Sequence, residues 1–104
     1  MVDLDRALAI AVKTGKVLFG ANTTIKNVMT GKVRLAVISS NCPERIRKDL
    51  EKYCKLSGIP LIVYPKNNVE LGRVCGKPFS ISTLAIRDPG DSDILKAVEG
   101  NRDV

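Results

Sequence analysis

The sequence predicts an α/β fold, a three-layer α/β/α sandwich around a central mixed sheet of four strands. Short apolar runs typical of buried strands alternate with segments whose apolar residues recur every three to four positions, which is typical of helices. Because this alternation continues throughout, helices are expected on both faces of the sheet. The 104 residues suit one compact domain, 1–104, whose last residues, 101–104, are expected to fray.

An amphipathic helix is predicted to open the chain and a short strand to follow it. Asp3 is a suitable N-cap, and Gly15 ends the helix. Residues 17–19, Val-Leu-Phe, are apolar and too few for a helix, which indicates a strand. The apolar positions of the helix are Leu4, Ala7, Leu8 and Ala11.

The second predicted helix lies within GANTTIKNVMTGK, residues 20–32. Asn22 or Thr23 is expected to cap this helix, and Gly31 to close it. Its apolar stripe is Ile25, Val28 and Met29.

A long charged helix is predicted between two buried strands. Residues 33–38 (VRLAVI) and 59–64 (IPLIVY) are largely apolar runs of the kind that forms strands covered on both faces. Pro43 suits the first position of the helix, where its missing N–H costs nothing, and Gly58 ends it.

The last third of the chain is expected to contain a short helix, a strand and a terminal helix. Asn67 and Glu70 have the spacing of a capping box, and Gly76 stops the helix that they open. Residues 81–86 form the last predicted strand, and a final helix is expected over about 92–99.

Composition argues against several classes of function. The chain has no histidine, which excludes catalytic dyads and triads built on imidazole. No Gly-x-Gly-x-x-Gly turn or phosphate-binding loop is present, and no cofactor is expected. No segment approaches the roughly 20 apolar residues that cross a bilayer, and the amino terminus does not resemble a signal peptide. We therefore expect a cytoplasmic protein with no membrane partner.

The cysteines and aspartates offer little for catalysis or metal binding. Cys42, Cys54 and Cys75 are widely spaced and contain no Cys-x-x-Cys pair, so we interpret them as reduced packing residues. Asp91 and Asp93 flank a helix start, where capping explains them better than a metal. Cys42 precedes a helix, but no base accompanies its thiol, so a small thiol enzyme or protein-docking module is a low-ranked alternative.

Positive charge is concentrated in the first part of the chain. Seventeen Lys and Arg residues against 11 Asp and Glu give a formal net charge of +6. Up to Gly58 there are 11 basic and 5 acidic residues, and from Ile59 onward there are 6 of each. This asymmetry indicates either a polyanionic partner such as a nucleic acid or a solvated basic surface, and charge alone does not choose between them.

The stretch from Gly20 to Lys26 has two interpretations. A helix amino end offers free N–H donors and partial positive charge, which together bind anions. Asn22, Thr23, Thr24 and Lys26 add side-chain donors for phosphate oxygens or for guanine N7 and O6. The simpler alternative is that Asn22 merely caps the helix, Thr24 is exposed and Lys26 is solvated.

Two other loops bear on this stretch. If the strands at 17–19 and 33–38 are parallel neighbours, Asn22, Lys26 and Asn41 converge at one edge of the sheet. Phe79 lies in a loop that is expected to be exposed, where it either packs at the edge of the core or contacts an unstacked base.

Several motifs in order resemble a known family. GANTTIKNVMTGK, SSNCP, LSGIP, NNVELGRVCGKP and DPGDSDIL are similar to the L-thirty-e family of archaeal and eukaryotic large-subunit ribosomal proteins. That family belongs to a superfamily of kink-turn RNA binders, which also includes the core protein of box C/D guide-RNA particles. The similarity spans almost the whole chain and implies an α/β/α sandwich with a structural, non-enzymatic role.

The resemblance also implies partners and site residues. The expected partners are ribosomal RNA at a kink-turn with tandem sheared G·A pairs, and other ribosomal proteins; the free chain is expected to be a monomer. Gly20, Asn22, Thr23, Thr24 and Lys26 map onto the segment that lies against the exposed guanine edges. The remaining implied RNA contacts are Asn41 and, against the nucleotide flipped from the bend, Phe79, Ser80 and Ile81.

A second kink-turn function remains open at this point, as the core protein of a guide-RNA particle. Those proteins usually have glutamate directly after the asparagine, where this chain has Thr23. The small hydroxyl side chain therefore resembles the ribosomal branch.

Overall fold

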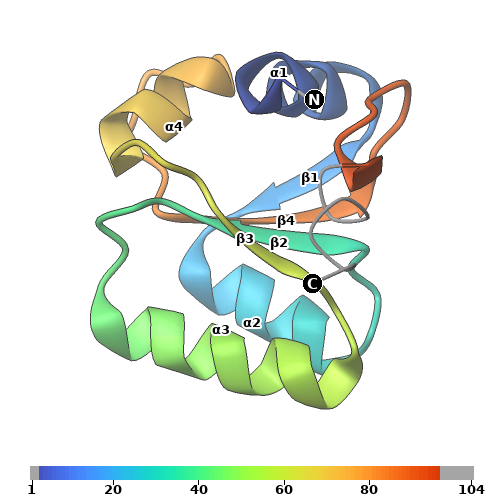
Figure 1. Ribbon diagram of the computed structural model, residues 1–104, viewed down its shortest axis with the longest axis vertical. Helices are drawn as coiled ribbons and strands as arrows, with labels where there is room; N and C mark the ends of the chain where they lie inside the picture. Colours follow the sequence, from blue (N-terminus) through green and yellow to red (C-terminus); the bar gives the residue numbers. More distant parts are fainter. Residues whose placement is uncertain (1–2, 97–104) are drawn as a thin grey trace.

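The computed structural model describes residues 3–96 and places helices on both faces of a four-stranded sheet (Figure 1). Helices α1 and α4 cover one face, and α2 and α3 cover the other, which confirms the predicted α/β/α sandwich. The elements are α1 (Leu4–Thr14), β1 (Lys16–Phe19), α2 (Ala21–Met29), β2 (Leu35–Ile38), α3 (Glu44–Ser57), β3 (Leu61–Val63), α4 (Asn68–Val74) and β4 (Thr83–Asp88).

The sheet is mixed, with strand order β1-β4-β2-β3. Strand β4 is antiparallel to both β1 and β2, while β2 and β3 are parallel. The condition that β1 and β2 are parallel neighbours is therefore not met, because β4 lies between them. Since each is antiparallel to β4, β1 and β2 still run in the same direction and end at the same edge. Their last residues, Phe19 and Ile38, pair with the adjacent β4 residues Leu84 and Thr83.

Strand β2 contributes side chains to both cores, as its unbroken apolar sequence predicts. Leu35 and Val37 join the cluster beneath α1 and α4. Ala36 and Ile38 join the cluster beneath α2 and α3. All four residues are buried, so β2 packs against the helices on both faces of the sheet.

Helix α2 differs from its predicted form in its N-cap and in its buried stripe. Its N-cap is Gly20, and Asn22 and Thr23 lie inside its first turn. Its buried residues are Thr24 and Val28, spaced one turn apart, whereas Met29 is 58% exposed. Thr24 therefore occupies the buried stripe in place of Met29, which a purely apolar pattern does not reveal.

The other boundaries move by one or two residues. Val33 and Ile59 are buried but precede β2 and β3, since apolar character marks burial and not strand pairing. Pro43 occupies the cap position of α3, one residue before the expected place. Of the helix predicted over 92–99, only Leu95 and Lys96 are described as helical; the remainder, with the tail at 101–104, lies outside the described residues. Among residues 3–96, no helix is long and apolar enough to span a bilayer.

We predict that stability falls at alkaline pH because two thiols are buried. Burial raises the pKa of Cys54 and of Cys75 from 9.0 to about 11. The unfolded chain therefore loses these protons first, so the free energy of unfolding decreases as pH rises from 9 through 11, by about 1–3 kcal/mol per thiol. Urea unfolding at pH 7.5, 9 and 10.5 under reducing conditions measures the slope. A variant combining Cys54→Ala and Cys75→Ala should show a shallower slope, and an unchanged slope contradicts the prediction.

Candidate nucleic-acid interface

Three loops meet at the edge of the sheet where β1 and β2 end, on the left in Figure 1. The N–H of Gly20 donates to the Thr83 carbonyl at 3.0 Å. The N–H of Ser39 donates to the Ser82 carbonyl at 2.9 Å. Both loops that follow these strands are thus hydrogen-bonded to adjacent residues at the start of β4. We call residues 20–26, 39–43 and 79–83 together the strand-end face.

The start of α2 presents unused donors on this face. Gly20 has φ +106° and ψ 147°, a conformation that L side chains rarely adopt, and it has no side chain to cap the helix. The first-turn N–H groups have no partner within the helix, and no side chain among residues 3–96 accepts from them. Asn22 and Lys26 are exposed and lie one turn apart, with Thr23 exposed beside them. The arrangement combines partial positive charge, an amide and an ammonium.

Two of the predicted site residues are buried. Thr24 is 0% exposed, and its hydroxyl has no hydrogen-bond partner in the described part of the chain. Ile81 is 3% exposed, and its N–H donates to the Asn68 carbonyl at 3.0 Å. The side chains of Thr24 and Ile81 therefore lie behind the surface that the other predicted residues form.

Asn41 is exposed and held by hydrogen bonds. Its Oδ1 accepts from the Ser39 hydroxyl at 2.9 Å and from the Asn68 N–H at 2.9 Å. Its Nδ2 donates to Asn68 Oδ1 at 3.2 Å. Sequence reasoning missed Asn68, because the partners are 27 residues apart and nothing local marks the pairing.

An open apolar hollow of about 520 Å³ lies beside the start of α2. Phe79 is 55% exposed at this hollow, and an exposed aromatic side chain is available to a partner. The Lys77 ammonium lies 5.1 Å from the centre of the Phe19 ring and adds positive charge nearby. The hollow is lined by Phe19, Gly20, Ala21, Ile46, Phe79, Ser80, Ile81, Ser82 and Thr83. Four of these residues were predicted from the sequence as RNA contacts: Gly20, Phe79, Ser80 and Ile81.

Gly72 of α4 supports the loop at Phe79, and sequence analysis missed this role. A Cβ at Gly72 would lie 2.1 Å from the Phe79 carbonyl oxygen, far inside van der Waals contact. The helix and the loop can therefore approach only because residue 72 has no side chain.

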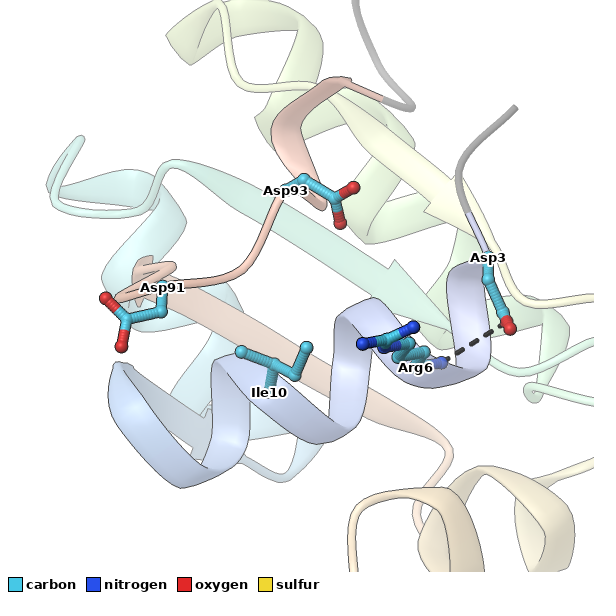
Figure 2. Close-up of a pocket in the computed structure, with 5 residues that line it drawn as sticks. All are labelled: Asp3, Arg6, Ile10, Asp91 and Asp93. Carbon is cyan, nitrogen blue, oxygen red and sulfur yellow. Dashed lines mark hydrogen bonds between the residues drawn. The ribbon is translucent and has the colours of Figure 1, made fainter.

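Another hollow, of about 390 Å³, lies between α1 and the loop at 91–93 (Figure 2). It is lined by Asp3, Arg6, Ile10, Asp91 and Asp93. Asp3 Oδ1 accepts from the Arg6 N–H at 3.3 Å, which is the capping bond predicted for α1. Within residues 3–96, no three potential ligands among Cys, Asp and Glu are grouped to hold a metal ion.

The Cys42 thiol contacts an uncharged hydroxyl and lines a shallow hollow together with Glu44 and Glu51. Its Sγ lies 3.7 Å from the Thr83 hydroxyl, an uncharged partner. The two carboxylates pair with Lys48 and Arg47, and the chain has no histidine to take the thiol proton.

We predict that Gly72→Ala displaces the Phe79 loop and lowers the free energy of unfolding by about 1–3 kcal/mol, because the new methyl group overlaps backbone that cannot rotate away. Urea unfolding and amide chemical shifts of residues 79–82 measure the two effects. Val69→Ala, at an exposed position of the same helix, is the control and should change neither. Wild-type stability together with wild-type shifts for Gly72→Ala would rule out this role.

Comparison with known proteins finds relatives of similar sequence, a solved structure of similar fold and a matching family. A protein named large ribosomal subunit protein eL30 from Methanothermobacter thermautotrophicus is 48% identical over 97 residues, covering 93% of this chain and 99% of the relative. The protein of the same name from Methanosphaera stadtmanae is 43% identical over 98 residues, covering 94% and 100%. A solved structure of a protein with unknown function from Bacillus halodurans has a TM-score of 0.81 and 28% identity, covering 94% and 97%.

The match to a family extends over all of the described residues. Residues 3–96 match the family described as the ribosomal protein L7Ae/L30e/S12e/Gadd45 family. This range contains every residue of the strand-end face. Together with relatives above 40% identity over more than nine-tenths of its length, the match shows that this chain belongs to the ribosomal protein L7Ae/L30e/S12e/Gadd45 family.

Proposed function

We propose that this chain is a non-catalytic structural protein of the large ribosomal subunit, which binds ribosomal RNA at a kink-turn through its strand-end face. One observation carries the proposal: an uncapped helix start with exposed Asn22 and Lys26 adjoins an apolar hollow at the same edge of the sheet. The relatives named large ribosomal subunit protein eL30 support the ribosomal part. On this proposal, residues 1–104 act as one kink-turn domain in the cytoplasmic ribosome, beside other ribosomal proteins, and the free chain is a monomer.

The start of α2 has the chemistry that a bent RNA requires. A kink crowds phosphates, and a positively polarised helix end with a nearby ammonium offsets their repulsion. Tandem sheared G·A pairs expose guanine edges that carry the acceptors N7 and O6. Asn22 and Lys26 are donors at adjacent positions on one helix face, and the exposed Thr23 hydroxyl lies beside them.

The apolar hollow suits the nucleotide that leaves the stack. An extruded base has two apolar faces and loses stacking energy unless a side chain replaces its neighbours. Phe79 offers an exposed ring, and Ser80 offers a hydroxyl at the rim. On this proposal, Thr24 and Ile81 act from behind the surface, where their burial keeps α2 and the 79–82 loop in place.

The relatives described above are named as ribosomal proteins, which favours ribosomal RNA over a guide RNA. A comparison of three RNAs at one stated ionic strength tests the choice: a ribosomal kink-turn, the same RNA with Watson–Crick pairs in place of its G·A pairs, and a box C/D kink-turn. We expect the pair replacement to weaken binding by roughly 100-fold or more, because the bend and the guanine edges are both lost. Unchanged affinity would count against kink-turn recognition, and tighter binding to the box C/D RNA would favour the guide-RNA role.

We predict that Lys26→Ala weakens binding to the ribosomal kink-turn by about 1–3 kcal/mol if the ammonium hydrogen-bonds to a base. If the ammonium neutralises a phosphate, the slope of log affinity against log salt concentration should become shallower by the equivalent of about one phosphate contact. Lys13→Ala is the matched control, because it removes the same charge from α1 on the other face of the sheet. Titrations at three salt concentrations separate the two roles. Equal losses for both variants would show that Lys26 contributes only general charge.

A further inference from the structure

We propose that Asn68 is a positioning residue for RNA binding, which holds the Asn41 amide in one orientation so that it offers the RNA a single N–H donor. The inference rests on the proposed function, because it concerns the same strand-end face. It extends that function by assigning a role to a residue outside the face as defined above. It also specifies the kind of RNA atom that Asn41 contacts.

The hydrogen bonds of Asn41 within the chain use most of the donors and acceptors of its side-chain amide. An asparagine amide has two N–H donors and one oxygen that accepts two hydrogen bonds. Both acceptor positions of Asn41 are used, by the Ser39 hydroxyl at 2.9 Å and by the Asn68 N–H at 2.9 Å. One donor is used as well, since Nδ2 donates to Asn68 Oδ1 at 3.2 Å. One N–H is left for a partner outside the chain.

This arrangement restricts what the exposed Asn41 recognises. With its oxygen occupied on both sides, the amide can donate to an RNA acceptor but cannot accept from an RNA amino or hydroxyl group. Phosphate oxygens, guanine O6 and purine N7 are acceptors of this kind. Rotating the amide by half a turn would place the Asn41 oxygen against Asn68 Oδ1, which is also an acceptor, so the Asn68 side chain favours the observed orientation. The Asn68 N–H favours the same orientation, because it would otherwise meet an NH₂ group.

Asn68 also connects Asn41 to the loop that lines the apolar hollow. Its Nδ2 lies 3.4 Å from the Ser82 hydroxyl, and its carbonyl accepts from the Ile81 N–H at 3.0 Å. The turn after β2 and the loop before β4 are therefore both positioned against the first residue of α4. A displacement of Asn68 would move the Asn41 donor and the hollow relative to each other.

The neighbouring Asn67 separates this role from helix stability. Asn67 Oδ1 accepts from the Glu70 N–H at 3.0 Å and caps α4. The Asn68 side chain is therefore not the cap, and its hydrogen bonds are directed away from the helix to Asn41 and Ser82. Replacing Asn67 weakens α4 but leaves the contacts of Asn41 intact.

The experiment compares four variants with the wild-type protein: Asn68→Ala, Asn41→Ala, both together, and Asn67→Ala as the matched control. Affinity for the ribosomal kink-turn RNA is measured below the unfolding temperature of every variant, at several salt concentrations. We expect Asn68→Ala to weaken binding about threefold to tenfold with an unchanged salt slope, because no charge is lost. In the Asn41→Ala background, Asn68→Ala should lower the affinity only about twofold. Asn67→Ala alone should lower the affinity less than Asn68→Ala does.

A second measurement tests the orientation in the free protein. In an amide NMR spectrum of labelled protein, the hydrogen of the Asn41 NH₂ group that bonds to Asn68 should exchange with solvent more slowly than in Asn68→Ala. Asn67→Ala should leave that exchange unchanged. Equal exchange in the wild type and in Asn68→Ala would overturn the inference.

The outcomes distinguish this inference from the function on which it rests. Failure of the wild-type protein to bind any kink-turn RNA would overturn both. Binding by the wild type, combined with equal losses for Asn67→Ala and Asn68→Ala or with an undiminished Asn68→Ala effect in the Asn41→Ala background, would overturn only the positioning role.

Discussion

The position of β4 between β1 and β2 is the constraint on which the site depends. Because β4 is antiparallel to both neighbours, β1 and β2 end at the same edge, opposite the adjacent residues Leu84 and Thr83. Helices α2 and α3 both begin at that edge (Figure 1). One strand thus brings together two helix starts and their free N–H groups, although the segments are far apart along the chain.

The exposed features of this edge are supported by residues that a ligand would not touch. Helix α2 begins without a side-chain cap, and Phe79 exposes an aromatic ring; both are unfavourable in isolation. Their geometry is maintained from behind by buried Thr24 and by Gly72, which lets the Phe79 backbone approach α4. On the proposed function, positions that affect RNA binding therefore include buried ones, which alanine substitution of the exposed residues alone would not identify.

Local sequence patterns identified some exposed residues of the candidate site but missed the residues that hold its loops in position. The donors at Asn22 and Lys26 follow from helix-start chemistry, and the structure places both on exposed positions of α2. The same pattern expected Thr24 at the surface, but packing against the sheet buries it. Asn68 and Gly72 gave no local signal, since one acts on a residue 27 positions away and the other acts by lacking a side chain.

The sequence by itself determined the alternation of helices and strands, the complete burial of β2 and the caps at Asp3 and Asn67, because hydrophobic periodicity and capping involve only residues a few positions apart. Only the tertiary structure decided that β4 separates β1 from β2, that Gly20 and not Asn22 precedes α2, and that Asn41 pairs with Asn68. The physical reason is that strand order and cross-loop hydrogen bonds depend on which distant segments share a core. No short window of residues contains that information.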